Sequence, residues 1–124
     1  CALPISGKWI SEVNREFGEP KPHDPEWAVR ATVWYDKFLF YRVKYKNECD
    51  RWGAALSAYN GGLGWHNKRR GRAEDPQDFW GSVRGINPGI TDGNQRENFD
   101  YPHKIIFKHQ PQFVRVGDKK ICIN

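Results

Sequence analysis

Hydrophobic positions recur every three or four residues along most of this chain, a period typical of amphipathic helices. The clearest run begins at Asp24 and Pro25, which suit the N-cap and the first helical position. We predict that the apolar stripe of this helix faces the core, with a ligand-binding surface as the alternative. The stripe consists of Trp27, Ala31, Trp34, Phe38 and Tyr41.

The same spacing predicts a first helix over about 8–17 and a last helix over about 97–108. Between them, a stretch rich in Gly, Pro, Asp and Asn over about 73–94 indicates a long surface loop, broken by a helical turn near 76–83. Near the end of the chain, apolar and polar residues alternate around a Gly-Asp pair, which is typical of a β-hairpin at 113–123. The prediction is a mainly α protein with a small C-terminal β-hairpin.

The most informative segment is Gly-Ala-Ala-Leu-Ser-Ala-Tyr-Asn-Gly-Gly at 53–62. We interpret it as a short buried helix that is capped by Asp50 and stopped by its two final glycines, because glycine adopts the left-handed conformation that ends many helices. Tyr59 and Asn60 then lie in the last turn, where a phenol and a carboxamide can face a groove. The apolar face of this helix carries Trp52, Ala55, Leu56 and Tyr59.

This segment resembles the Ala-Tyr-Asn motif of the lytic transglycosylases, lysozyme-like enzymes that cleave bacterial peptidoglycan. The triplet at 58–60 follows an Ala-Leu-rich helix and precedes Gly-Gly-x-Gly, a form similar to that of phage-borne members. The opening at 24–28 is also similar to the family, so the resemblance spans about 8–107. Downstream, four residues keep the register of the family's Glu-Thr-Arg-x-Tyr-Val-x-Lys-Ile-like segment: Glu97, Tyr101, Lys104 and Ile105.

The resemblance implies one lysozyme-like domain over 1–124, with 1–8 as the remnant of an upstream segment and 9–108 as the helical body. It implies cleavage of the MurNAc–GlcNAc bond of peptidoglycan to a 1,6-anhydro product, with no cofactor. Pro102 departs from the family pattern, and we expect it to shift the start of the last helix or to kink it. The substrate-binding residues implied by the resemblance are Tyr59, Asn60, Tyr101 and Glu97.

The catalytic acid of the family is a Glu in a Glu-Ser pair that precedes a Gly-Leu-x-Gln-like loop, and neither occurs before Trp9. The register therefore implies that the chain begins downstream of its own catalytic residue, and that an upstream segment or a partner chain completes the fold. The catalytic residue stays unassigned, with Glu97 as the fallback. We expect no cleavage by the chain alone, because a positioned proton donor contributes typically about 10²–10⁴-fold in rate.

At 124 residues the chain is long enough for one domain, and its mean hydropathy of −0.85 leaves no run that could span a bilayer. Its net charge of +5 favours anionic partners. A basic cluster is predicted to contact anionic cell-wall polymers, with an ordinary solvated loop as the alternative. This cluster consists of Lys68, Arg69, Arg70 and Arg72. The spacing of His and Cys indicates no metal site, and no nucleotide-binding or serine-hydrolase motif occurs.

The three cysteines leave two questions open. Cys49 and Cys122 either form a disulfide, which suits an exported protein, or remain free thiols. Cys1 is either the lipidated first residue of a mature lipoprotein or merely the point where the sequence begins. The resemblance implies a location outside the cytoplasm, in the periplasm or cell envelope, or in a phage virion delivered to the envelope.

Two functions of other classes stay open beside the enzyme. The first is a non-catalytic peptidoglycan-binding protein or phage virion structural protein that keeps the groove without the acid. The second is a basic nucleic-acid-binding module, in which Trp65 and His66 would stack on bases beside the basic cluster. Because no nucleic-acid motif accompanies these residues, we do not expect nucleic acid as a partner.

Overall fold

Residues 24–114 and Cys122 are described by a computed structural model of the chain. This part of the chain is built of helices and contains no strand, so the prediction of a mainly α protein is confirmed. The predicted helix at 8–17 and the segment at 1–8 lie outside the described residues. The elements are α2 (Pro25–Arg42), α3 (Glu48–Gly61), α4 (Leu63–Arg72), the π-helical turn η1 (Phe79–Val83) and α5 (Asp92–Val114).

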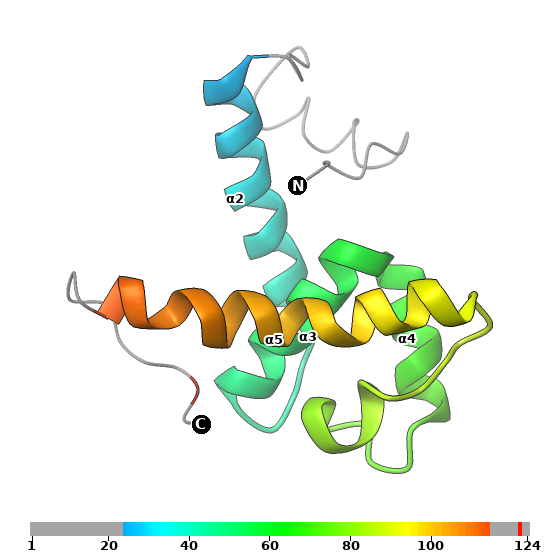
Figure 1. Cartoon of the computed structure of the whole chain (residues 1–124). Coiled ribbons are helices and arrows are strands. Elements are labelled where there is room, and N and C mark those ends of the chain that lie inside the picture. Colours follow the sequence, from blue (N-terminus) through cyan, green and yellow to red (C-terminus); the bar gives the residue numbers. More distant parts are fainter. Residues whose placement is uncertain (1–23, 115–121, 123–124) are drawn as a thin grey trace.

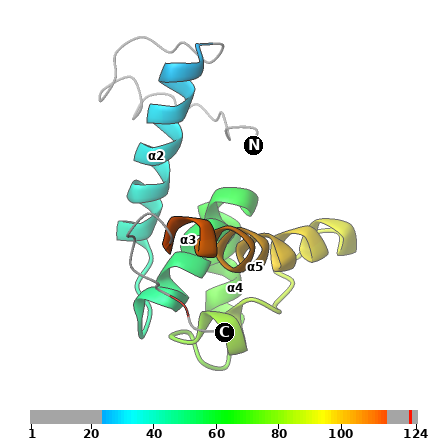
Figure 2. The same ribbon diagram turned by 60° about the vertical axis from the view of Figure 1, so that its left-hand side comes forward.

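Helix α3 is the central element, because it packs against α2, α4, η1 and α5. Helix α5 crosses α3, whereas α2 extends away from the other helices in both views (Figures 1 and 2). The small residues of α3 allow this close packing: a Cβ on Gly53 would lie 2.6 Å from Cζ2 of Trp80, closer than real Cβ contacts. The core cluster consists of Leu39, Val43, Ala54, Ala55, Ala58, Tyr59, Phe79 and Val83.

Helix α2 begins as the sequence predicts but buries a different face. Asp24 Oδ1 accepts hydrogen bonds from the amides of the first turn, and Pro25 occupies the first helical position. In the predicted stripe, Trp27 and Ala31 are buried, Trp34 and Phe38 are half-buried, and Tyr41 is 63% exposed. The prediction is therefore wrong for Tyr41, because α2 meets α3 along the line of Leu39 and Val43, one helical turn apart, and Tyr41 lies off that line.

The structure also corrects the predicted N-cap of α3, which is not Asp50. Its N-cap is Asn47, whose Oδ1 accepts from the amide of Asp50 at 2.8 Å. Asp50 is buried inside the first turn and accepts instead from the amides of Phe79 at 2.8 Å and Trp80 at 3.3 Å. The predicted capping carboxylate therefore holds η1 against α3.

Helix α5 is longer than predicted, because it begins at Asp92 and runs through the buried Pro102 to Val114. Pro102 lies in the interior of α5, so it does not set the start of this helix. Phe113 and Val114, predicted to open the hairpin, belong to α5, and 115–121 and 123–124 lie outside the described residues. The loop at 73–91 with its short helical turn agrees with the sequence, whereas α4 was not predicted.

Cys49 and Cys122 form a disulfide across a sequence separation of 73 residues. This bond decides between the two alternatives left open by the sequence and ties the first turn of α3 to the C-terminal end of the chain. Among the described helices, none combines the length and the hydropathy that a transmembrane span needs.

Candidate functional site

A buried hydrogen-bond network holds the end of α3 against α5. Asn98 of α5 donates from Nδ2 to the backbone oxygen of Ser57 at 2.9 Å and to Oδ1 of Asn60 at 3.2 Å. In return, Ser57 Oγ donates to Oδ1 of Asn98 at 3.0 Å. Ser57 and Asn98 are both buried, so these bonds are shielded from water and fix the orientation of the Asn60 carboxamide.

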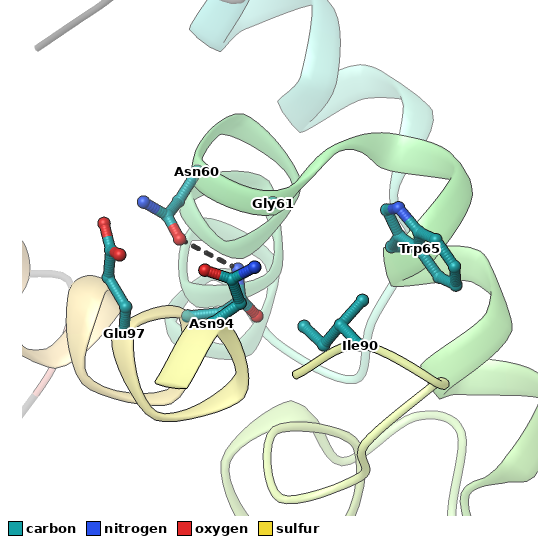
Figure 3. Close-up of a pocket in the computed structure, with 7 residues that line it drawn as sticks. Asn60, Gly61, Trp65, Ile90, Asn94 and Glu97 are labelled. Carbon is teal, nitrogen blue, oxygen red and sulfur yellow. Dashed lines mark hydrogen bonds between the residues drawn. The ribbon is translucent and has the colours of Figure 1, made fainter. Parts of the chain in front are cut away.

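The fixed carboxamide of Asn60 opens onto a pocket of about 250 Å³ between the end of α3, the start of α4 and the start of α5. Figure 3 shows Asn60, Asn94 and Glu97 toward one side of this pocket, with Trp65 and Ile90 toward the other. The walls therefore combine amides, one carboxylate and one indole ring. The pocket is lined by Asn60, Gly61, Trp65, Ile90, Asn94, Glu97 and Asn98.

The two glycines predicted to stop α3 also shape this pocket. Gly62 has a φ of +97°, a conformation that residues with a Cβ rarely adopt, and it links the end of α3 to the start of α4. A Cβ on Gly61 would lie 2.6 Å from Nδ2 of Asn98, so a side chain there would displace Asn98 from its network. Gly61 is therefore needed for the close contact of α3 with α5.

Of the four residues predicted to bind substrate, the structure brings two into this pocket. Asn60 and Glu97 line it, whereas Tyr59 and Tyr101 do not. Tyr59 is only 6% exposed and packs its ring 5.8 Å from that of Tyr35 and 6.5 Å from that of Tyr101. Tyr59 and Asn60 thus point away from each other, one into an aromatic cluster and one into the pocket.

A carboxyl group that the sequence analysis missed lies beside this aromatic cluster. Asp36 of α2 is half-buried, and burial raises its pKa to about 6. The pKa of Tyr101 is raised to about 12, mainly by burial, with smaller contributions from Tyr59 and Asp36. Burial also raises the pKa of Tyr59; a hydrogen bond from Thr32 opposes this shift, and Asp36 adds to it. The sequence signal that could have identified Asp36 is a lone carboxylate within the apolar run of α2.

Asp36 also lines a second pocket, of about 410 Å³, between α2 and α3. Half of its lining residues are aromatic, and the ring centroids of Phe40 and Trp52 are only 4.3 Å apart. The other lining residues are Val33, Lys37, Phe40, Tyr41 and Trp52. The raised pKa of Asp36 follows from its partial burial beside these apolar side chains, which disfavours the charged carboxylate.

The basic cluster is not an open patch. Lys68 and Arg72 are exposed, but Arg69 is fully buried, and Arg70 is half-buried. Arg70 donates to two backbone carbonyl groups and lies 4.6 Å from the ring centroid of Tyr45. Two of the four cations therefore hold α4 to its neighbours, which leaves less positive charge for a polymer than the sequence suggests.

His66 of α4 is likewise held inside the protein and carries no charge at physiological pH. His66 is buried, and its Nε2 lies 2.8 Å from the hydroxyl of Tyr45. Burial lowers the pKa of His66 to about 4, with smaller contributions from Arg69 and Arg70, so the ring is neutral at physiological pH. Over residues 24–114 and at Cys122, no three His, Cys, Asp or Glu side chains gather as a metal ion would require.

Comparison of the chain with models of protein families, with curated proteins and with solved structures finds no match. The comparisons therefore assign it to no family. What the geometry provides is a small polar pocket with one aromatic wall and, separately, a carboxyl group of raised pKa close to an aromatic cluster.

Proposed function

We propose that this chain binds peptidoglycan glycan strands through the pocket at the end of α3, and that it acts as a lytic transglycosylase of lysozyme-like fold. The observation that carries the proposal is the network of Ser57, Asn98 and Asn60, which presents a fixed carboxamide to a pocket with an indole wall and a carboxylate. A few fixed polar groups and an apolar wall are typical of small-molecule sites.

The size of the pocket supports a single sugar ring as its occupant. Its volume of about 250 Å³ lies just below the roughly 300–1,000 Å³ of sites for drug-sized ligands. Trp65 is partly exposed, so its indole can cover the apolar face of a ring, while Asn60, Asn94 and Glu97 reach hydroxyl and acetamido groups. A longer strand would continue across the surface on either side.

Cleavage of a glycosidic bond needs a carboxylic acid that is still protonated near neutral pH. In a transglycosylase this acid protonates the glycosidic oxygen, and the carboxylate then takes a proton from the C6 hydroxyl, which closes on C1 to form the 1,6-anhydro ring. Asp36 has the raised pKa that this role requires, and it lies close enough to Tyr59 and Tyr101 for its charge to raise their pKa values. Glu97, the fallback candidate for the acid from the sequence, lines the pocket at the end of α3 (the sugar pocket) but is exposed.

The disulfide supports a location outside the cytoplasm, because such bonds persist in oxidising compartments. We therefore place the protein in the cell envelope or in a virion delivered to it. Nucleic acid is a weaker candidate partner, because Arg69 is buried and Arg70 donates to two backbone carbonyl groups, which leaves fewer donors free for phosphates.

The test is to incubate the full chain with purified sacculi, and to measure both its co-sedimentation and the release of 1,6-anhydro-muropeptides by mass spectrometry. We expect both signals from the unaltered chain, where the sequence alone predicted no cleavage, because Asp36 offers an acid that the sequence analysis did not consider. We expect a loss of binding in Asn60→Ala. Asn67→Ala is the matched control, because Asn67 is exposed on α4 and does not line the pocket. Equal binding by the two variants would refute the pocket as the glycan site. Binding without product release would leave a non-catalytic glycan-binding protein.

If products are released, two further variants assign the acid. Asp36→Asn should abolish product release while sacculus binding persists. Glu97→Gln should weaken sacculus binding more than it lowers the rate at which the bound protein releases product. The opposite pattern would place the proton donor at Glu97.

A further inference from the structure

Arg69 carries a positive charge that no carboxylate balances in the described part of the chain. The side chain is 0% exposed. Its Nε donates to the backbone oxygen of Ile86 at 3.1 Å, and its Nη2 donates to Oε1 of Gln95 at 2.9 Å, so both partners are neutral. Its Nη1 is buried and has no hydrogen-bond partner. Because buried charges are normally paired, this guanidinium favours an anion nearby.

The unpaired nitrogen does not line the sugar pocket of about 250 Å³ but lies close to Gly61, which does. A Cβ placed on Gly61 would be 3.8 Å from Arg69 Nη1, and Gly61 itself lines the pocket. The carboxamide of Asn98 lies closer still to this position, with its Nδ2 at 2.6 Å, so Arg69 acts on a ligand at that wall through its charge and not by direct contact. The field of a buried charge reaches across such a distance with little screening by water.

The other charges around the pocket are arranged with opposite signs at its two sides. Lys68 Nζ lies 4.5 Å from the ring centroid of Trp65, which adds positive charge at that wall. Glu97 lies on the side of Asn60 and Asn94, away from Trp65 (Figure 3). An occupant with one anionic group and several hydroxyl groups therefore fits better than a uniformly neutral or uniformly anionic one.

We propose that the pocket selects a sugar that carries a free carboxylate, with the carboxylate toward Gly61 and the ring hydroxyls toward Glu97. This inference rests on the proposed glycan-binding function and names the substrate class within it. In peptidoglycan, the lactyl group of muramic acid presents such a carboxylate once its peptide has been removed. The preferred glycan is therefore a peptide-free strand, and the carboxylate at the end of a stem peptide is the competing source of the same charge.

The test compares peptide-free glycan strands with the same strands after their lactyl carboxylates have been coupled to methylamine. Both ligands have the same backbone and differ in charge. We expect the full chain to bind the charged strands about tenfold more tightly at low salt, equivalent to about 1.4 kcal/mol, and the ratio to fall as salt is added. Free stem peptide should not compete.

Three variants tie the preference to the charges in and around the pocket. Arg69→Gln should reduce the ratio toward one, and Glu97→Gln, at an exposed position that keeps the fold, should raise it by removing the opposing charge. Lys68→Gln is a second exposed variant, expected to lower the ratio in case Arg69→Gln fails to fold.

Three outcomes would overturn the inference. Equal affinity for the two strands refutes the carboxylate preference but leaves glycan binding in place. Competition by stem peptide assigns the charge to the peptide and refutes the sugar assignment. Binding to neither strand refutes the proposed function of the pocket as well.

Discussion

Asn98→Ala is the sharpest test of how α3 and α5 are held together. The substitution removes three hydrogen bonds in a buried setting, two with Ser57 and one with Asn60. Each such bond contributes about 1 kcal/mol net, so we expect a loss of about 3 kcal/mol in the free energy of unfolding. For a chain of 124 residues this corresponds to a fall of about 10 °C in Tm.

The assay is urea unfolding followed by tryptophan fluorescence, with far-UV circular dichroism as a second probe of two-state behaviour. Asn94→Ala is the matched control, because Asn94 is exposed on the same helix and should change stability by less than about 0.5 kcal/mol. A double-mutant cycle of Ser57→Ala with Asn98→Ala should show a coupling energy of about 1 kcal/mol or more. A loss below about 1 kcal/mol in Asn98→Ala, or no coupling, would refute the network as the link between the two helices.

Three further predictions concern the body of the protein. Asp36→Asn should stabilise the fold at pH 8 and hardly at pH 4, because burial raises the folded pKa of Asp36 to about 6 from its ordinary value of 3.8. The cost of the ionised form therefore accumulates as pH rises from 3.8 to about 6 and is complete above that. Discounted for partial exposure, the gain should be about 1–2 kcal/mol by urea unfolding, and an equal gain at both pH values would contradict the burial argument. Gly53→Ala should lower the free energy of unfolding by about 1–3 kcal/mol, because its Cβ would meet Trp80 and Phe79, whereas Gly71→Ala, in open space on α4, should be neutral or slightly stabilising. Similar melting temperatures for these two variants would contradict the close contact of α3 with η1. Leu39→Ala should cost about 2–5 kcal/mol and Tyr41→Ala less than about 1 kcal/mol, and the reverse order in chemical denaturation would restore the predicted stripe.

Local signals in the sequence predicted the features that depend on neighbouring residues. The Asp-Pro start of α2 and the glycines at the end of α3 act within one helical turn, so they were identified without the fold. The mainly α content followed from the period of the apolar residues. The full length of α5 did not, because a proline in the interior of a helix looks the same in sequence as one that ends it.

Features that depend on packing between helices could not be predicted from the sequence. Asp36 is half-buried, and Arg69 fully buried, only because of what lies against α2 and α4. The spacing placed Tyr59 and Asn60 together in one turn, but which of them would face the pocket depends on how α5 crosses α3. Helix α4 was missed because its glycines and its charged residues together give a weak apolar pattern.

The disulfide between Cys49 and Cys122 has a consequence for proteolysis. Every peptide bond from the start of α3 to the C-terminal cysteine lies within one covalent ring, and this ring includes the exposed loop at 73–78. A protease that cuts the loop once would leave Asn60 on one fragment and Glu97 on the other, yet the two fragments would stay joined. Such a nicked protein would run as one band on a non-reducing gel and as two after reduction, and the disulfide would keep both sides of its pocket together.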